Sequence, residues 1–266
     1  MPTKGSVSSR GFESEIALII KNSSDRIRKE LSRTQHVLEY DLKPKPSQVI
    51  QDTYYDTKER FLGEKRITLR IRRMDDTLLL STKSDFRRIA GDIIQRREME
   101  RAWSYNSIRV LARNLKLYIP IMSSSKFQSL SVSRVLATMG LEVIQERRTH
   151  REPRDIVIRD KVPVSILAEL AIDHVTYDFG DISVGLSEIE VEAKAARSIP
   201  KVRDIADALV SKYSPSLQQW FHGKFVTGLA IQKLLKTKAF RSSLLSGDLG
   251  PEAFQLIERV IQSRRF

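Results

Sequence analysis

The chain has 266 residues, 41% of them hydrophobic, and its 46 Lys and Arg side chains outnumber its 33 Asp and Glu side chains by 13. This length and apolar content can support a sizeable core, and the basic balance favours anionic partners such as nucleotides, polyphosphate or nucleic acid. The absence of cysteine excludes disulfides and thiolate metal sites, and four scattered histidines argue against a zinc site. A metal ion would therefore be held by oxygen ligands.

Targeting and membrane signals are not evident in the sequence. No apolar run approaches the roughly 20 residues that a spanning helix needs, and the N-terminus lacks the features of a secretory signal. We therefore expect a cytoplasmic protein without a membrane partner.

The first part of the chain reads mostly as strands. Residues 1–10 are small and polar and predict a disordered leader. Alternating apolar residues then predict strands, and Asp75 and Asp76 predict the turn of a tight hairpin. The expected strands are 12–21, 49–55, 66–73, 77–83 and 92–103.

The middle of the chain changes to helical spacing and predicts a helical insert at about 104–140. One helix carries Ile108 and Leu111, and a second carries Val135 and Leu136. The serines at 123–125 predict a loop between them.

Strands resume after the insert, and helices follow them. The expected strands are 142–150, 156–159, 166–177 and 182–193, and helical patterns cover 202–209, 226–234 and the segment that opens at Pro251. We expect one domain at 11–240 and a C-terminal helical extension at 241–266. This order predicts an α+β fold: a closed or nearly closed antiparallel β-barrel of about eight strands with helices packed outside.

Charged side chains spaced two residues apart recur along these strands. Because residues i and i+2 of a strand point to the same face, each run aims its charge at one side of the sheet. Such a face is often simply the solvated side of an antiparallel sheet. Here, however, the first and last runs are acidic and the middle ones mostly basic, which favours a charged tunnel. The runs are Glu13 and Glu15; Arg70 and Arg72; Lys83; Arg96, Glu98 and Glu100; and Glu188, Glu190 and Glu192.

Several short motifs occur in a fixed order along the chain. They are Glu13-Ser14-Glu15, Thr53-Tyr54-Tyr55-Asp56-Thr57, Leu69-Arg70-Ile71-Arg72, Ser81-Thr82-Lys83, Arg96-Arg97-Glu98-Met99-Glu100, Asp173-His174-Val175, Glu188-Ile189-Glu190 and His222-Gly223-Lys224-Phe225. Together they resemble the triphosphate tunnel metalloenzymes, also called the CYTH superfamily, over most of residues 12–230. Its members include class IV adenylate cyclases, thiamine triphosphatases and inorganic triphosphatases.

The resemblance implies a metal-dependent triphosphatase. Carboxylates would bind Mg²⁺ or Mn²⁺, and cations would bind the phosphates. The implied metal ligands are Glu13, Glu15, Glu188 and Glu190; the implied phosphate ligands are Arg70, Arg72, Lys83, Arg96, Arg147, Arg148 and Lys224; and the implied catalytic set is Glu13, Glu15, Arg70, Arg72 and Lys83.

Four further acidic residues are weaker candidates for the same site. They are Glu98, Glu100, Asp173 and Glu192. Glu98 and Glu100 could instead form ion pairs with neighbouring arginines, and Asp173 could orient an arginine.

The chain departs from the family pattern at two places. Ala17 stands where the family has a lysine, so one phosphate contact is missing unless another cation replaces it. The segment Gln145-Glu146-Arg147-Arg148 stands where the family has K-x-R, and its register decides which arginine faces inward.

Three functions remain open at this point. The first is hydrolysis of inorganic triphosphate or a nucleoside triphosphate. The second is binding, with little or no turnover, of triphosphate, polyphosphate or a triphosphorylated RNA end. The third is class IV-type adenylate cyclase activity. A nucleic-acid partner has no supporting motif beyond the basic composition.

Overall fold

The computed structural model describes residues 11–89, 93–119, 121–159, 165–242, 244 and 248–263, so the predicted leader at 1–10 lies outside the described residues. The longer strands are β1 (Gly11–Ile20), β4 (Gln48–Thr57), β5 (Thr68–Met74), β6 (Thr77–Ile89), β7 (Ile93–Ala102), β8 (Leu141–Ile158), β9 (Ile166–Asp178) and β10 (Ser183–Ala193). The short strands are β2 (His36–Val37), β3 (Tyr40–Pro44) and β11 (Leu217–Trp220).

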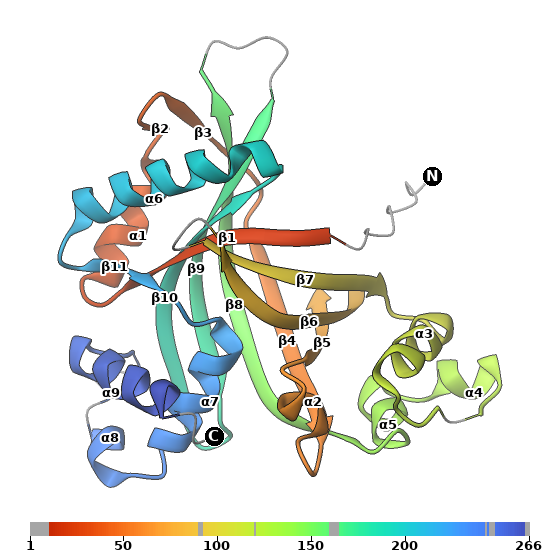
Figure 1. Cartoon of the computed structure of the whole chain (residues 1–266). Helices are drawn as coiled ribbons and strands as arrows, with labels where there is room; N and C mark the ends of the chain where they lie inside the picture. Colours follow the sequence, from red (N-terminus) through yellow and green to blue (C-terminus); the bar gives the residue numbers. More distant parts are fainter. Residues whose placement is uncertain are drawn as a thin grey trace. The chain divides into compact units, whose positions relative to one another are not determined.

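The helices are α1 (Ser24–Arg33), α2 (Phe61–Glu64), α3 (Tyr105–Leu115), α4 (Ser124–Ser129), α5 (Val132–Ala137), α6 (Ile199–Tyr213), α7 (Lys224–Leu234), α8 (Lys238–Ser242) and α9 (Pro251–Gln262), with a 3₁₀ turn at Ala196–Ser198. Figure 1 shows these elements along the chain. None of the helices in the described residues has both the length and the apolar character that crossing a membrane requires.

Hydrogen-bonded pairing among the described strands closes on itself. The order is β8, β4, β5, β6, β7, β1, β10, β9, and β9 pairs back to β8. This circular order of eight antiparallel strands is that of a closed β-barrel with helices outside, and it confirms the predicted fold class. In addition, β3 pairs with β8, β2 with β3, and β11 with β1.

The chain divides into two compact units that interleave in sequence. The first contains Ile50–Phe86 and Arg96–Glu146, together with the segment that ends at Phe12. The second contains Glu13–Val49, Arg87–Gln95 and the chain from Arg147 onward.

The first unit has one apolar core. Leu69 on β5 and Leu80 on β6 turn one side of the sheet toward Leu111 on α3 and Leu136 on α5. Serine side chains begin the three helices of the insert: the hydroxyls of Ser104, Ser123 and Ser131 each accept a hydrogen bond from the backbone N–H three residues later. The helices therefore cover one face of the strands, and the other face is left for polar side chains.

The second unit has two apolar cores, on opposite faces of the same strands. On one face Leu18 of β1 and Leu170 of β9 pack with residues of α1 and α6. On the other face Ile19 of β1 and Tyr177 of β9 pack with Ile231 of α7, as well as with residues of α8 and α9. The second face is apolar only at this end, because the alternating positions farther along the strands are carboxylates.

Two local predictions were wrong. The strands expected at 142–150 and 156–159 are one continuous strand, β8, although Pro153 has no N–H to donate; its carbonyl accepts a hydrogen bond from the Lys45 N–H at 3.0 Å. The expected serine loop at 123–125 is the start of α4, because Ser123 caps that helix.

Candidate functional site

A cluster of charged side chains lies on the helix-free face of the first unit. Cross-strand register places Arg70 of β5 opposite Tyr54 and Ser81, and Arg72 opposite Asp52. Leu69 and Ile71 alternate with the arginines and enter the core, so both guanidinium groups point away from the helices.

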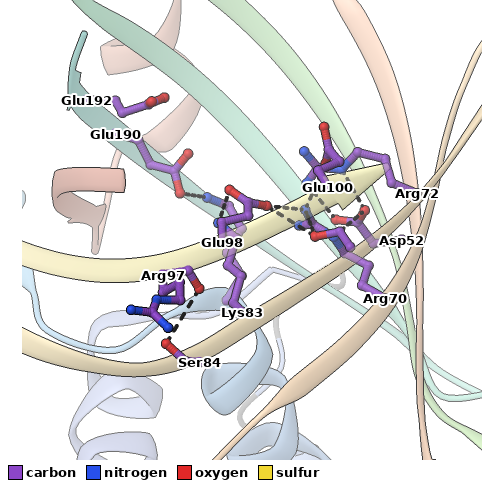
Figure 2. Close-up of polar contacts among 12 residues, drawn as sticks. Asp52, Arg70, Arg72, Lys83, Ser84, Arg97, Glu98, Glu100, Glu190 and Glu192 are labelled. Atoms are coloured by element: carbon purple, nitrogen blue, oxygen red, sulfur yellow. Dashed lines mark hydrogen bonds and ion pairs between the residues drawn. The ribbon is translucent and has the colours of Figure 1, made fainter. Parts of the chain in front are cut away.

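Each arginine is already held by carboxylates (Figure 2). Nη2 of Arg70, whose side chain is 5% exposed, lies 3.2 Å from Glu98 Oε1 and 3.6 Å from Glu100 Oε2. Nε and Nη2 of Arg72 donate to the two oxygens of Asp52 at 2.8 and 3.1 Å, a two-pronged contact that fixes the guanidinium plane. The predicted alternative, in which Glu98 and Glu100 pair with a neighbouring arginine, is therefore confirmed for Arg70.

Lys83 and Ser81 complete this group, which we call the arginine cluster: Asp52, Arg70, Arg72, Ser81, Lys83, Glu98 and Glu100. Lys83 Nζ is 3.6 Å from Glu98 Oε2, and the Ser81 hydroxyl donates to Glu98 Oε1 at 3.1 Å. Arg96 is half-buried and shares the strand face of Glu98 by alternation on β7. Within the arginine cluster, three cations thus meet three carboxylates, so their charges balance.

Burial and neighbouring charge oppose each other at Arg70. Burial disfavours its charged form, but Asp52, Glu98 and Glu100 outweigh burial and raise the pKa of Arg70. Burial raises the pKa of Glu100, Arg70 opposes this, and Glu98 adds to it.

Carboxylates line one face of β1 and β10 in the second unit. The register places Glu15 opposite Glu192 and Ala17 opposite Glu190. On the other side of β10, Glu188 is opposite Asp173 and Glu192 is opposite Glu169. Glu188 and Asp173 are almost fully buried, Glu15 is buried and Glu13 is half-buried.

Two cations bind the inner part of this face. Lys224 Nζ lies 2.9 Å from Glu188 Oε1, 3.1 Å from Asp173 Oδ2 and 2.5 Å from Glu190 Oε1. Nε and Nη2 of Arg151 donate to the two oxygens of Asp173 at 2.8 and 2.6 Å, and Nη2 also reaches Glu190 Oε2 at 2.5 Å. We call these five residues the carboxylate cluster: Arg151, Asp173, Glu188, Glu190 and Lys224.

The start of α7 is anchored so that Lys224 reaches the sheet. The Tyr177 hydroxyl donates to the Lys224 carbonyl at 2.8 Å, and Trp220 Nε1 donates to the Thr227 hydroxyl at 3.0 Å. The Trp220 side chain is buried. These contacts fix the first turn of α7 at the boundary between the apolar core and the carboxylates.

The carboxylate cluster shifts the pKa of its members strongly. Burial raises the pKa of Glu188 to about 7; Lys224 opposes this shift, and Glu190 and Asp173 add to it. For Lys224, burial disfavours the ammonium, but the three carboxylates outweigh burial and raise its pKa. Burial also raises the pKa of Glu192, with Lys194 opposing and Glu13 adding to the shift.

The register of β8 separates the two predicted arginines. Arg147 is buried, whereas Arg148 is exposed on the opposite face. Arg148 therefore does not join the face that carries Arg147 and Arg151. Asp173 orients Arg151, which confirms the predicted alternative role for that aspartate.

Arg151 and Asp52 are the residues that sequence reasoning missed. Arg151 falls next to Glu152 and Pro153, where the proline predicts a break, yet it continues the alternation of Arg147 and Thr149. Asp52 lies between Ile50 and Tyr54 on its face of the strand, so no charged run marks it. Alternation carried through the proline could have found Arg151.

Ala17 belongs to the apolar packing under α7. It is 3% exposed, lies opposite Trp220 as well as Glu190, and is part of the core that contains Ile231. A lysine here would place its stem in that core. The ammonium that contacts Glu190 comes instead from Lys224.

The donor set fits a hard divalent cation by its chemistry. Glu13, Glu15, Glu188, Glu190 and Glu192 supply only carboxylate oxygens, the ligands that Mg²⁺ and Mn²⁺ prefer. Over the ranges that the structure describes, no group of three or more acidic or histidine side chains is arranged to hold a metal ion as it stands. Glu188 and Glu190 are instead directed at Lys224 and Arg151.

The strand order and the two clusters define a closed β-barrel protein with buried groups of both signs. The model of the CYTH domain matches residues 18–218, and the chain belongs to this family. Comparison of the sequence with curated proteins gives no match.

Several solved structures are similar to this chain at low sequence identity. HpAC1 from Hippeastrum, described as a candidate adenylyl cyclase with a dominant triphosphatase activity, is 18% identical with a TM-score of 0.51; the match covers 82% of this chain and 95% of that one. PH1819 from Pyrococcus horikoshii OT3 is 16% identical with a TM-score of 0.48, over 83% and 99% of the two chains. The bh2851 protein from Bacillus halodurans, described as a candidate adenylate cyclase, is 17% identical with a TM-score of 0.46, over 79% and 94%.

Proposed function

We propose that this protein hydrolyses a triphosphate, either inorganic triphosphate or a nucleoside triphosphate, with the help of a divalent metal ion. The observation that carries the proposal is the pair formed by the buried Glu188 and the half-buried Glu190, both held by Lys224 on the charged face of a CYTH-domain chain. The triphosphatase activity described for HpAC1 supports the same reaction class.

In this proposal the carboxylates hold the metal and the cations hold the substrate. Glu13, Glu15, Glu188 and Glu190 would bind Mg²⁺ or Mn²⁺, which when bound neutralises phosphate charge and activates water. Arg70 and Arg72 would bind phosphate oxygens through their guanidinium forks, with Lys83 as a point charge. Arg96, Arg147 and Lys224 would add further cationic contacts.

The carboxylates in each cluster indicate how a phosphate could bind there. Arg70 and Lys224 already have carboxylate partners that keep them oriented and charged. A phosphate oxygen can replace a carboxylate oxygen at either group with little change in geometry, so these cations are preorganised for an anion.

Phosphate release from inorganic triphosphate and from ATP, with Mg²⁺ and with Mn²⁺, tests the proposal. We expect E188Q/E190Q and R72Q each to lower turnover at least about a hundredfold, because the loss of a charged transition-state contact costs about 3 to 4 kcal/mol. E252Q, on the exposed start of α9, is the matched control. Metal binding is measured separately, as the rise in melting temperature that Mn²⁺ induces. Of these three variants, only E188Q/E190Q should lose that rise.

No release from any triphosphate by a folded sample would overturn the hydrolase. If Mn²⁺ still raised the melting temperature of E188Q/E190Q as it does that of the native protein, the assignment of these glutamates as metal ligands would be wrong. The ATP arm also distinguishes a cyclase, because a cyclase forms a cyclic nucleotide and pyrophosphate instead of orthophosphate.

A second candidate, a receptor that binds triphosphate, polyphosphate or a triphosphorylated RNA end with little or no turnover, is favoured by Ala17. If the missing lysine limits the chemistry, A17K should raise turnover at least tenfold. If Lys224 already supplies the cation at Glu190, A17K should bring no gain and should destabilise the fold by about 1 to 3 kcal/mol through overpacking against Trp220. Triphosphate-induced stabilisation without turnover in the native protein would favour the receptor.

A further inference from the structure

The helical insert carries a large share of the positive charge and no negative charge. Between Glu100 and Glu142 the sequence has no Asp or Glu, and it has six cations: Arg101, Arg109, Arg113, Lys116, Lys126 and Arg134. These 41 residues therefore contribute +6 to a chain whose net charge is +13. The solvent-exposed face of an ordinary helix carries both acidic and basic side chains, so the charge of this segment is unusual.

Three of these cations form a stripe on α3 and its C-terminal cap. Arg109, Arg113 and Lys116 are spaced four and three residues apart, which places them on one side of a helix. All three are exposed. Ile108 and Leu111 lie on the opposite side and enter the core.

Among the described residues, no counterion lies beside the stripe. Within the described part of the chain, Arg109, Arg113 and Lys116 have no carboxylate at ion-pair distance, and neither have Lys126 and Arg134 on the two following helices. Like charges at this spacing repel one another, so the arrangement weakens an isolated α3. A polyanion would remove that cost.

An exposed aromatic residue follows the stripe directly. The loop after α3 presents Tyr118, which is 69% exposed, and Ile121, which is 99% exposed. Aromatic rings beside arginines are the usual means of holding single-stranded bases, because a base stacks on the ring while the guanidinium groups bind the phosphates.

We propose that the insert, through Arg109, Arg113, Lys116 and Tyr118, binds single-stranded nucleic acid. Figure 1 shows α3, α4 and α5 grouped together in the insert. These helices pack on the side of β5 and β6 that carries Leu69 and Leu80, opposite to the arginine cluster. The surface is therefore distinct from the proposed triphosphate site, and its role goes beyond triphosphate hydrolysis.

An anionic membrane is the competing partner for a basic surface. Attachment to a bilayer needs a sizeable apolar face on the same helix as the cations. The apolar side of α3 is used up in the core, and the large apolar side chains exposed in the insert are Tyr118 and Ile121 in one loop. The distribution of cations over three helices favours an extended anionic strand.

Fluorescence anisotropy with a labelled 20-nucleotide single-stranded RNA, from 50 to 200 mM salt, tests the proposal. The test variant is R109Q/R113Q/K116Q. The control is R26Q/K29Q/R33Q on α1, which removes the same two arginines and one lysine from one side of a helix where Asp25 and Glu30 lie nearby. Both variants change only surface positions, and thermal melts verify that they fold.

We expect the insert variant to bind at least tenfold more weakly at 50 mM salt, with a salt slope shallower by about 2, because three phosphate contacts are lost. The α1 variant should stay within threefold of the native protein. Y118A should weaken binding about fivefold or more and leave the salt slope unchanged, because stacking displaces no counterions.

Four results would overturn the proposal. The first is no RNA binding by the native protein below about 100 µM, and the second is an equal loss of affinity in both triple variants, which would indicate bulk charge alone. The third is equal binding of a blunt duplex of the same length, and the fourth is an unchanged RNA affinity of the insert variant together with a loss of binding to phosphatidylserine vesicles. Phosphate release by the insert variant should match that of the native protein, so failure of the triphosphatase proposal would be seen separately.

Discussion

The arginine cluster and the carboxylate cluster both hold partly buried charges, but they differ in charge balance and in which side chains water can reach. In the first, three cations meet three carboxylates, and the side chains of Arg72, Lys83, Glu98 and Glu100 are 18 to 24% exposed. Asp52 and Arg70 of this cluster are buried more deeply, at 1 and 5% exposed. In the second, two cations meet three carboxylates; Lys224, Asp173 and Glu188 are at most 7% exposed, and Arg151 and Glu190 are 16% exposed. Water reaches the outer side chains of both clusters, but an unbalanced charge at Lys224, Asp173 or Glu188 is screened least. The arginine cluster should therefore tolerate a change of charge that would destabilise the carboxylate cluster.

The largest effect is expected at Lys224. K224M removes the ammonium that contacts Glu188, Glu190 and Asp173 and leaves buried carboxylates with Arg151 alone. We expect the free energy of unfolding to fall by about 3 to 5 kcal/mol, the usual cost of breaking a buried ion pair. Chemical denaturation measures this change.

K236M, at an exposed lysine just beyond α7, is the control and should change stability by less than about 0.5 kcal/mol. If K224M lost no more than K236M, the buried ion pairs would not matter for the fold. A divalent cation should restore more stability to K224M than to the native protein if the carboxylates bind metal.

A smaller effect, with opposite consequences for stability and binding, is expected at Asp52. D52N removes the charge that fixes Arg72, so we expect about 2 kcal/mol of lost stability. The same change leaves the cluster with a net positive charge, and affinity for inorganic triphosphate should rise about tenfold, equivalent to about 1.4 kcal/mol. Denaturation and calorimetric titration measure the two quantities.

D76N, in the exposed turn after β5, changes the net charge equally and serves as the control. A fall in triphosphate affinity in D52N would show that Asp52 positions Arg72 for the ligand more than it neutralises it. Equal gains in D52N and D76N would show an effect of net charge alone.

The smallest effect is expected at His222, on the edge of the second unit's apolar core. Burial lowers its pKa below the ordinary value of 6.5; Glu258 opposes this shift, and Arg88 adds to it. As pH falls through 6.5, the unfolded chain takes up a proton that the folded chain resists, so this residue makes the protein less stable in acid. Glu188, whose pKa is raised in the folded protein, has the opposite effect: it makes the protein more stable as the pH falls.

Comparison of variants isolates the histidine from the carboxylates. Between pH 7.5 and 5.5, H222Q should lose less stability than the native protein, whereas H150Q, at an exposed position on β8, should follow the native protein. Parallel pH profiles for H222Q and the native protein would contradict the assignment. Urea midpoints at each pH give the measurement.

Much of the fold could be predicted because it follows from local periodicity. Alternation identified the longer strands, and apolar residues at helical spacing identified α3, α6, α7 and α9, the last beginning at Pro251 as expected. Boundaries failed where a local signal was ambiguous. Pro153 suggested a break because it cannot donate a hydrogen bond, and the serines at 123–125 suggested a loop although Ser123 caps α4.

The candidate site could be predicted only in part. Runs such as Arg70 with Arg72, or Glu188 with Glu190, were visible because each occupies one strand. Their counterions were not, because Asp52 and Arg151 come from other strands and stand alone in their own sequence context. The acidic runs and the mostly basic runs therefore each carry counterions that the runs themselves do not show, and convergence of the clusters on one tunnel stays a prediction.

The sequence by itself determined the family, most of the strand and helix segments and the faces on which charge alternates, because these depend on spacing along one segment. Only the tertiary structure decided which charges neutralise one another, because an ion pair depends on the register between strands and on the docking of a helix such as α7. Ala17 shows the difference: along the chain it is a missing lysine, whereas in the fold it packs under α7, and Lys224 contacts the glutamate opposite it.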